Sequence, residues 1–142
     1  MIRYTDSIEN ITPEMLEGFF DGWRNRPSRE THLKILKNSK FVVLAIDDSK
    51  SKVVGFISAI SDGILCAYIP LLEVLAEYGK KGIGKELTTR MLAKLNKLYM
   101  IDLTCDKNLE PFYASCGMSP AIEENCTAMM VRNYERQSGK EV

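Results

Sequence analysis

Apolar residues recur at three- and four-residue steps in two parts of the chain, which is the spacing of one buried helix face. The first part follows Thr12 and Pro13, which suit a helix start, and should end near residues 24–27. The second spans residues 82–98 and is the clearest predicted helix. Between them Ser28 can cap a further helix. The apolar positions are Met15, Leu16, Phe19, Phe20 and Trp23 in the first part, and Ile83, Leu87, Met91, Leu95 and Leu98 in the second.

Short apolar or β-branched runs predict the strands. Two of them, at residues 41–46 and 53–60, are separated by a polar turn and predict a hairpin. The others lie at residues 2–5, 65–75, 100–105 and 127–134, and a short helix is expected at residues 109–116. Pro70 should make the strand at residues 65–75 irregular. This order predicts a mixed α/β sheet of the α+β kind and not a doubly wound one.

Composition narrows the class of protein. A chain of 142 residues has the usual size of one domain, so we expect a single domain over residues 1–142. Nineteen Lys and Arg residues balance nineteen Asp and Glu residues, which gives no support to a nucleic-acid partner. No apolar run reaches the length of a membrane span, and Arg3, Asp6 and Glu9 interrupt the first twelve residues, so we expect no membrane partner and a cytoplasmic protein.

The four cysteines do not have the spacing of a metal site. Cys66, Cys105, Cys116 and Cys126 are separated by gaps of 39, 11 and 10 residues, and the chain has one histidine, His32. We therefore expect no metal ion and free cysteines that pack as small apolar residues.

The most informative stretch lies between a predicted strand and the strongest predicted helix. It is rich in glycine and lysine and comprises Gly79, Lys80, Lys81, Gly82, Ile83, Gly84 and Lys85. The first turn of a helix leaves backbone N–H groups unpaired and carries partial positive charge, and glycine lets an anion approach the main chain. The stretch therefore predicts a phosphate-binding turn.

Two nucleotide-binding motifs fit this turn poorly. A Walker loop requires Ser or Thr after the lysine, whereas Glu86 follows Lys85. The dinucleotide fingerprint requires a third glycine, whereas Leu87 stands at that position. A P-loop nucleotide binder is therefore the least favoured alternative.

The turn resembles the coenzyme A signature of the GCN5-related N-acetyltransferase (GNAT) family, [Gln/Arg]-x-x-G-x-[Gly/Ala]. Gly82 and Gly84 match both small positions, whereas Gly79 replaces the Gln or Arg. Residues 72–75 resemble the family's splayed fourth strand, and residues 111–118 resemble its F-Y-x-x-x-G-F block. The resemblance covers about residues 41–134 and implies the acyl-CoA N-acyltransferase fold, a mostly antiparallel central sheet flanked by helices.

The resemblance also implies the chemistry. Acetyl-CoA would be the cosubstrate and an amine would attack its thioester directly. Tyr113 matches the tyrosine that protonates the departing thiolate, and Glu73 is our candidate general base. A backbone N–H of the strand polarises the acetyl carbonyl in the family. The implied coenzyme-binding residues are Val74, Leu75, Gly79, Lys80, Lys81, Gly82, Ile83, Gly84, Lys85 and Asp106; the family usually has Asn at the last position.

A second class of function stays open at this point, namely a module that binds or senses acetyl-CoA without catalysis. The replaced residue at Gly79 and the acid at Asp106 favour it, whereas Tyr113 favours an enzyme. The acceptor amine, a small molecule or a peptide, cannot be identified from the sequence. Family members often dimerise, so a homodimer is an open expectation.

Overall fold

The computed structural model describes residues 1–140, and its core is a five-stranded sheet. Its strands follow one another across the sheet in chain order: β1 (Ile2–Thr5), β2 (Phe41–Asp47), β3 (Lys52–Ser61), β4 (Cys66–Val74) and β5 (Met100–Asp102). Neighbouring strands are antiparallel except β4 and β5, which are parallel. This mostly antiparallel sheet confirms the predicted fold class and differs from the parallel sheet of a P-loop protein.

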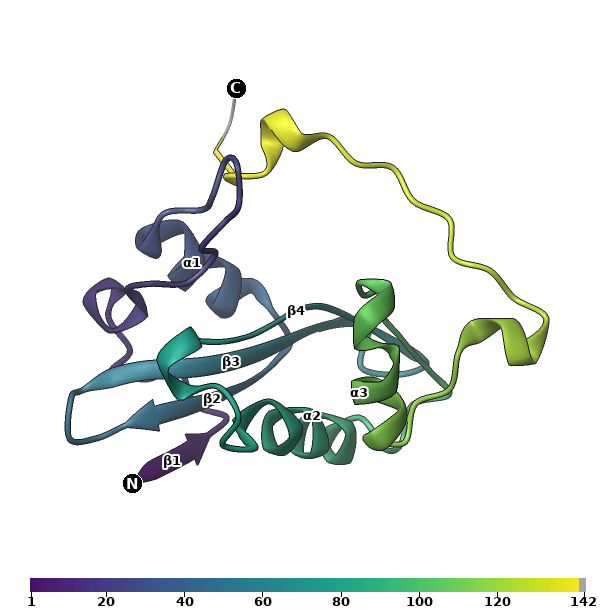
Figure 1. Cartoon of the computed structure of the whole chain (residues 1–142), viewed down its shortest axis with the longest axis horizontal. Coiled ribbons are helices and arrows are strands. Elements are labelled where there is room, and N and C mark those ends of the chain that lie inside the picture. The colour runs from purple at the N-terminus through teal and green to yellow at the C-terminus, as the bar shows by residue number, and fades with distance from the viewer. Residues whose placement is uncertain (141–142) are drawn as a thin grey trace.

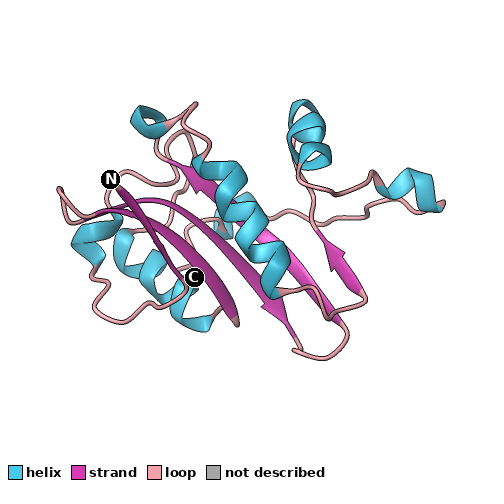
Figure 2. Ribbon diagram, turned by 90° about the horizontal axis from the view of Figure 1, so that it is seen from below, coloured by secondary structure: helices cyan, strands magenta, loops and turns pink. Residues whose placement is uncertain are grey.

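Helices cover both faces of the sheet (Figures 1 and 2). The helix α1 (Arg29–Asn38) lies on one face, and α2 (Ile83–Lys94) lies on the other. The helix α3 (Glu110–Ser115) stands beside the end of the sheet where β5 lies. Short 3-10 turns connect these elements: η1 (Pro13–Leu16), η2 (Ala76–Tyr78), η3 (Lys107–Leu109), η4 (Ala121–Glu124) and η5 (Tyr134–Arg136).

The predicted apolar face is confirmed for Ile83, Leu87 and Met91 of α2 and for Leu95 directly after it, all at most 3% exposed. The helix ends at Lys94, earlier than the predicted residue 98, and Leu98 is only half-buried. This face packs closely on β3 because β3 has a glycine at the contact. A Cβ atom added to Gly55 would lie 3.0 Å from Leu87 Cδ1 and 3.2 Å from Ile83 Cγ2. The position of α2, and of the turn that precedes it, therefore depends on this missing side chain.

The helix predicted after Pro13 is wrong beyond its first turn. Only Pro13–Leu16 forms a 3-10 turn, and the chain then bends through Gly18, Phe20 and Gly22, whose φ angles are +98°, +63° and +82°. Three of the five apolar residues are buried as predicted, since Leu16, Phe19 and Phe20 are at most 4% exposed. The other two are not, because Met15 is half-buried and Trp23 is 38% exposed. The two glycines break the helix, and burial of the aromatic rings then requires an irregular backbone.

The strand predicted at residues 127–134 is also wrong. No strand forms there, and residues 126–133 run away from the body of the molecule as an extended arch (Figure 1). We call residues 126–133 the C-terminal arm. The strand predicted at residues 100–105 is shorter than expected, because β5 ends at Asp102. Both differences lie at the same edge of the sheet, where β5 has no neighbour beyond β4 within residues 1–140.

Candidate active site

The parallel strands β4 and β5 separate part of the way along β4. They pair only from Cys66 opposite Met100 to Tyr68 opposite Asp102. Beyond Tyr68, β4 continues to Val74 and pairs with β3 alone, and Pro70 interrupts the pairing at the start of this stretch. The second half of β4 therefore presents a free edge towards the side from which β5 has diverged.

Backbone N–H groups at this free edge can be assigned from the register. Leu75 N–H donates to the Val54 carbonyl oxygen at 2.9 Å, so Leu75 and Val54 form a hydrogen-bonded pair. Hydrogen-bonded and non-bonded pairs alternate along antiparallel strands. The N–H groups of Leu72 and Val74 therefore point away from β3, towards the opening. Of the two predicted residues, Val74 offers a free N–H and Leu75 does not; the sequence prediction missed Leu72, which only the register reveals.

The glycine-rich turn follows directly after the end of β4. Gly79 N–H donates to the Ala76 carbonyl oxygen at 3.1 Å, and the first backbone bond of α2 runs from Glu86 N–H to the Gly82 carbonyl oxygen at 3.0 Å. Between these two bonds, the N–H groups of residues 80–85 have no backbone partner within residues 1–140. Six successive N–H groups, several of them in the first turn of a helix, form a positively polarised concavity.

The turn has glycine at Gly82 and at Gly84 for different structural reasons. Gly82 adopts φ +79° with open space around it, so it serves the left-handed backbone at the start of α2. A Cβ atom on Gly84 would lie 3.5 Å from Phe112 Cζ and 3.7 Å from Val74 Cγ2. Gly84 therefore marks the point where β4, α2 and α3 meet. An alanine fits there, whereas a larger side chain would enter the space between them.

The charges near the turn favour an anion. Lys80, Lys81 and Lys85 are exposed, and Lys81 Nζ lies 5.3 Å from the centre of the Tyr78 ring. The acid in the first turn of α2, Glu86, forms an ion pair of 2.7 Å with Arg90, one helical turn further on. Its charge is thus partly neutralised by a partner on the side away from the turn.

The predicted acid Tyr113 lies on α3, half-buried, with its ring 5.0 Å from that of Phe112. Burial is the main cause that raises the pKa of Tyr113 above that of an ordinary phenol, and Cys105 and Cys116 raise it further. The phenol therefore keeps its proton at neutral pH, as a proton donor must. A Cβ atom on Gly84 would meet both Phe112 and Val74, so α3 lies next to the end of β4.

Glu73 lies on the opposite face of β4 from Val74, because successive side chains of a strand alternate. Both carboxylate oxygens accept from Phe20 N–H at 2.9 Å, and they hold Phe20 at its positive φ. Burial raises the pKa of Glu73, the Phe20 hydrogen bond opposes this shift, and the charge of Asp21 adds to it. The carboxylate therefore has a structural partner as well as the raised pKa that a general base requires.

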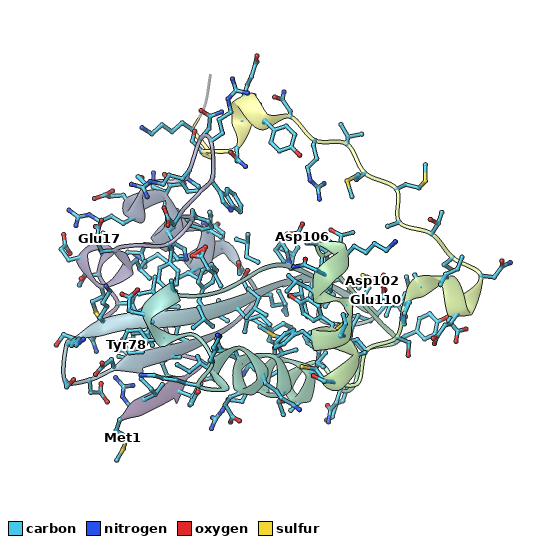
Figure 3. The ribbon with its side chains drawn as sticks, in the orientation of Figure 1. Met1, Glu17, Tyr78, Asp102, Asp106 and Glu110 are labelled. Carbon is cyan, nitrogen blue, oxygen red and sulfur yellow. The ribbon has the colours of Figure 1, made fainter. Side chains whose placement is uncertain are left out.

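Asp106 is exposed and forms no side-chain hydrogen bond within residues 1–140. It precedes η3, and Figure 3 shows it at the end of the η3–α3 stretch that lies farther from α2. No side-chain contact ties Asp106 to the glycine-rich turn within residues 1–140, so its predicted part in coenzyme binding stays a prediction.

A cavity of about 430 Å³ opens on the Glu73 side of β4. Leu71, two residues before Glu73 and on the same strand face, lines it together with Pro70 and Tyr68. Trp23 forms another wall, and the cavity is also lined by Arg132, at the end of the C-terminal arm, and by Tyr134, directly after it. Trp23 and the arm are the parts of the chain whose structure the sequence predicted wrongly.

Residues 1–140 contain neither a metal-binding cluster nor a membrane-spanning helix. They hold no cluster of three His, Cys, Asp or Glu side chains that could bind a metal ion. No helix among them has the length and apolar character needed to cross a membrane.

Comparison with known proteins identifies the family. The family model described as an acetyltransferase (GNAT) domain matches residues 8–132. This chain therefore belongs to the GNAT acetyltransferases, and it is an acetyltransferase, as the glycine-rich turn and the splayed strand predicted. The expectation of a module without catalysis is not supported by this family membership.

Individual relatives agree with this assignment. An uncharacterized N-acetyltransferase, ycf52, from Pyropia yezoensis is 30% identical over 120 residues, which cover 80% of this chain and 68% of that protein. The chloroplastic GCN5-related N-acetyltransferase 3 of Arabidopsis thaliana is 33% identical over 61% of this chain, which corresponds to 38% of the Arabidopsis protein. Both relatives carry the name N-acetyltransferase.

Solved structures also match. A Deinococcus radiodurans protein described as an acetyltransferase is 42% identical, with a TM-score of 0.91 over 99% of this chain and 94% of that one. The GNAT family protein SP0256 of Streptococcus pneumoniae is 28% identical, with a TM-score of 0.76 over 94% of this chain and 98% of that one. The first match includes the C-terminal arm, because it covers nearly the whole chain.

Proposed function

We propose that this acetyltransferase binds acetyl-CoA along the free edge of β4 and transfers the acetyl group to the amine of an acceptor by direct attack. The observation that carries the proposal is the series of unpartnered N–H groups from residue 80 to 85, directly beyond the free edge of β4. The turn offers hydrogen-bond donors to the pyrophosphate of the coenzyme. The free edge of β4 offers donors to the extended pantetheine arm, which leads away from the pyrophosphate.

The pyrophosphate would lie on the turn. Its oxygens would accept from the backbone N–H groups between Lys80 and Lys85, and the exposed lysines would add attraction at longer range. The absence of Gln or Arg at Gly79 removes one side-chain contact. Lys81, a residue of the turn whose ammonium group lies over the Tyr78 ring, would compensate for the lost phosphate contact.

The thioester would lie beside Val74. The N–H of Val74 points from the free edge of β4 and would donate to the acetyl carbonyl oxygen, on which negative charge develops during attack. The N–H of Leu72, two residues earlier on the same edge, would hold the pantetheine arm by a backbone hydrogen bond. Main-chain donors explain why neither side chain needs to be polar.

Proton transfer would use Tyr113 and Glu73, whose pKa values are both raised. The amine nitrogen forms a bond to the acetyl carbon, the carbon–sulfur bond breaks, and the thiolate takes a proton from the Tyr113 hydroxyl. The proton that the amine loses would pass to Glu73, directly or through water. Glu73 faces the Trp23 side of β4, so the acceptor would enter through the cavity lined by Leu71 and Trp23.

The first experiment measures acetyl-CoA binding by calorimetry, and thiol release in the presence and absence of a panel of amines. We expect binding, and thiol release that depends on an amine. Binding without amine-dependent release would overturn the transfer, and absence of heat at millimolar ligand would overturn the coenzyme site.

A matched pair of variants locates the site. Gly84→Asp places a carboxylate beside the phosphates and should weaken acetyl-CoA binding about tenfold or more through charge repulsion. Gly84→Ala fills only ordinary contact space against Phe112 and should bind nearly as the wild type does. Equal affinities for the two variants, both folded by circular dichroism, would show that the turn does not hold the coenzyme.

A further inference from the structure

A β-bulge in β4 places the wall of the cavity and the candidate base on one face of the strand. Between Ser58 and Ile60, β3 advances by two residues. Their partners on β4, Leu71 and Tyr68, are three residues apart, so β4 contains one extra residue. Tyr68 and Leu71 therefore lie on the same face, and both line the cavity. Glu73 follows Leu71 by two positions and shares this face, so an acceptor in the cavity lies on the same side of β4 as the carboxylate.

Trp23 forms another wall of the cavity, and its place depends on Glu73. Phe20 N–H donates to the Glu73 carboxylate at 2.9 Å, and Trp23 N–H donates in turn to the Phe20 carbonyl oxygen at 3.1 Å. The ring centres of Trp23 and Phe20 lie 4.9 Å apart, so the two rings pack together. Trp23 nevertheless keeps 38% of its surface exposed. A large flat apolar surface, fixed relative to the candidate base, is therefore open to a ligand.

The segment that follows the C-terminal arm is tied to the segment of Trp23. The Asn25 side-chain amide donates to the Tyr134 carbonyl oxygen at 2.8 Å, and Asn25 N–H donates to Gln137 Oε1 at 2.9 Å. Asn25 stands two residues after Trp23, so these bonds hold Trp23 and Tyr134 at the same cavity. Its volume of about 430 Å³ is within the range of small-molecule sites. Aromatic rings from both segments, together with the apolar wall of β4, favour a ligand with a flat apolar body.

Arg132 gives the cavity a positive charge, and within residues 1–140 no other charged residue lines it. The guanidinium forms no ion pair among these residues, and its side-chain hydrogen bond goes to the neighbouring Val131 carbonyl oxygen at 3.4 Å. The planar fork of arginine matches a carboxylate, whereas an acceptor with a second cationic group would be repelled. A single cation beside neutral polar residues suits one negative charge better than the two charges of a phosphate monoester.

We propose that the acceptor is a small aromatic amino carboxylate. Its ring packs on Trp23, its carboxylate binds the Arg132 guanidinium, and its amine points along β4 towards Glu73 and the thioester. This inference rests on the proposed function, since it takes the cavity as the acceptor side of the site. It adds that Trp23 and Arg132 determine the specificity for the acceptor, whereas the glycine-rich turn and the edge of β4 hold the coenzyme. Amines without a negative charge, and polyamines above all, are then poor substrates.

Matched amines test the role of the negative charge. Phenylalanine and phenethylamine differ by one carboxylate beside the amine, and para-(aminomethyl)benzoate and benzylamine differ by one at the far end of the ring. We would measure thiol release by the full chain with acetyl-CoA and each amine, corrected for the fraction of free amine. In at least one pair, we expect kcat/KM to be about tenfold or more higher for the carboxylate, the contribution of a hydrogen bond to a charged group. Spermidine and phosphoethanolamine should react more slowly than that carboxylate. Equal values within both pairs, or a faster phosphate amine, would overturn the inference.

Two arginines provide a matched pair of variants. Arg132→Gln removes the charge in the cavity, and Arg136→Gln removes an equal charge from η5, at a residue that does not line the cavity. Both side chains are exposed, so neither change should disturb the fold. We expect Arg132→Gln to lose the preference for the carboxylate, with little change in kcat/KM for the amine without it, and Arg136→Gln to keep the preference. The same result for both variants, whether loss or retention, would contradict the role of Arg132.

Binding to the cavity can also be measured without the reaction. The chain has one tryptophan, so its fluorescence reports on Trp23 alone. We would titrate the wild type and Arg132→Gln with the same four amines in the presence of coenzyme A. We expect a saturable change with a carboxylate, at about tenfold lower concentration in the wild type than in Arg132→Gln.

The two measurements separate this inference from the proposed function. A carboxylate that binds at Trp23 without thiol release would support the inference and contradict the transfer. Thiol release with no preference for a carboxylate would support the transfer and overturn the inference. Absence of a saturable change with both carboxylates would overturn the inference whatever the turnover.

Discussion

The hydroxyl of Tyr78 donates a hydrogen bond of 2.6 Å to Asp47 Oδ2 and so joins the turn before α2 to the end of β2. Tyr78 ends η2, at the hairpin side of the glycine-rich turn (Figure 3). Hydrogen bonds from Ser49 and Tyr78 lower the pKa of Asp47 to about 2, so the acceptor is a carboxylate at neutral pH. A charge-assisted bond thus fixes one side of the proposed phosphate site.

Replacement of Tyr78 by phenylalanine tests this link. The ring stays in place beneath Lys81, but the hydroxyl is lost, so the turn is less firmly held. We expect the affinity for acetyl-CoA to fall a few-fold and the melting temperature to fall by about 2–4 °C. Asp47→Asn, which keeps an acceptor without the charge, should lie between the wild type and Tyr78→Phe. Unchanged affinity in both variants would show that the turn is positioned by other contacts.

The sequence predicted those parts of the fold that local patterns determine. The face of α2 and the β2–β3 hairpin follow from periodicity and a polar turn, and both are confirmed. The segment after Pro13 failed because its backbone depends on a distant partner: Glu73 holds Phe20 in a left-handed conformation that no neighbouring residue indicates. The prediction for the arm failed because its apolar pattern is that of a strand, whereas no strand within residues 1–140 pairs with it.

The candidate site, too, could be predicted from the sequence only where local residues determine it. The glycine-rich turn was found from its residues, because a missing side chain and a helix start are both visible in sequence. Which N–H groups are free was not visible, because that depends on register: Leu75 is bonded to Val54, whereas Leu72 and Val74 face the opening. The hydrogen bond that Glu73 accepts from Phe20 N–H is likewise a tertiary contact that the sequence does not reveal.

The phenol of Tyr113 should be needed for turnover and not for binding. Tyr113→Phe keeps the ring beside Phe112 and removes the proton donor. We expect kcat to fall about a hundredfold, the low end of what a general acid contributes, with little change in the affinity for acetyl-CoA. Single-turnover measurements would separate the chemical step from product release. If kcat were unaffected, another group or water would protonate the thiolate.

Glu73 can be tested for its two roles separately. Glu73→Gln leaves an oxygen that accepts from Phe20 N–H but cannot take a proton, whereas Glu73→Ala removes both. If Glu73 is the general base, we expect both variants to lose tenfold or more in kcat, and only the alanine variant to lose stability as well. A glutamine variant with wild-type kcat and an unchanged acidic limb of the pH profile would leave Glu73 with the structural role alone.

His32 should make the stability of the fold depend on pH. Its side chain is 1% exposed, its ring centre lies 4.3 Å from that of Phe56, and neither ring nitrogen has a hydrogen-bond partner within residues 1–140. Burial lowers the pKa of His32 from 6.5 to about 4. The folded protein therefore contains the neutral imidazole over a pH range in which the unfolded chain is already protonated.

The sign of the effect follows from which state binds more protons. Between pH 6.5 and about 4 the unfolded chain binds the extra proton, so the free energy of unfolding falls as the pH is lowered through this window. The shift corresponds to about 3 kcal/mol between the two ends of the window, at about 1.4 kcal/mol per pKa unit. Above pH 6.5 this contribution is complete and constant. Glu73 acts in the opposite direction, since its raised pKa makes the folded state the better proton binder.

His32→Phe isolates the histidine from these other groups. Phenylalanine fits the surrounding rings of Phe19, Phe20 and Phe56 and loses no hydrogen bond, so the variant should be folded at neutral pH. Urea unfolding of both proteins at intervals from pH 7.5 to 4.5 gives the difference in unfolding free energy, in which the contributions of Glu73 and the surface carboxylates cancel. We expect this difference to move in favour of the variant as the pH falls, because only the wild type has an imidazole that must stay neutral. Parallel curves for the two proteins would mean that the buried imidazole accepts a proton as readily as it does in the unfolded chain.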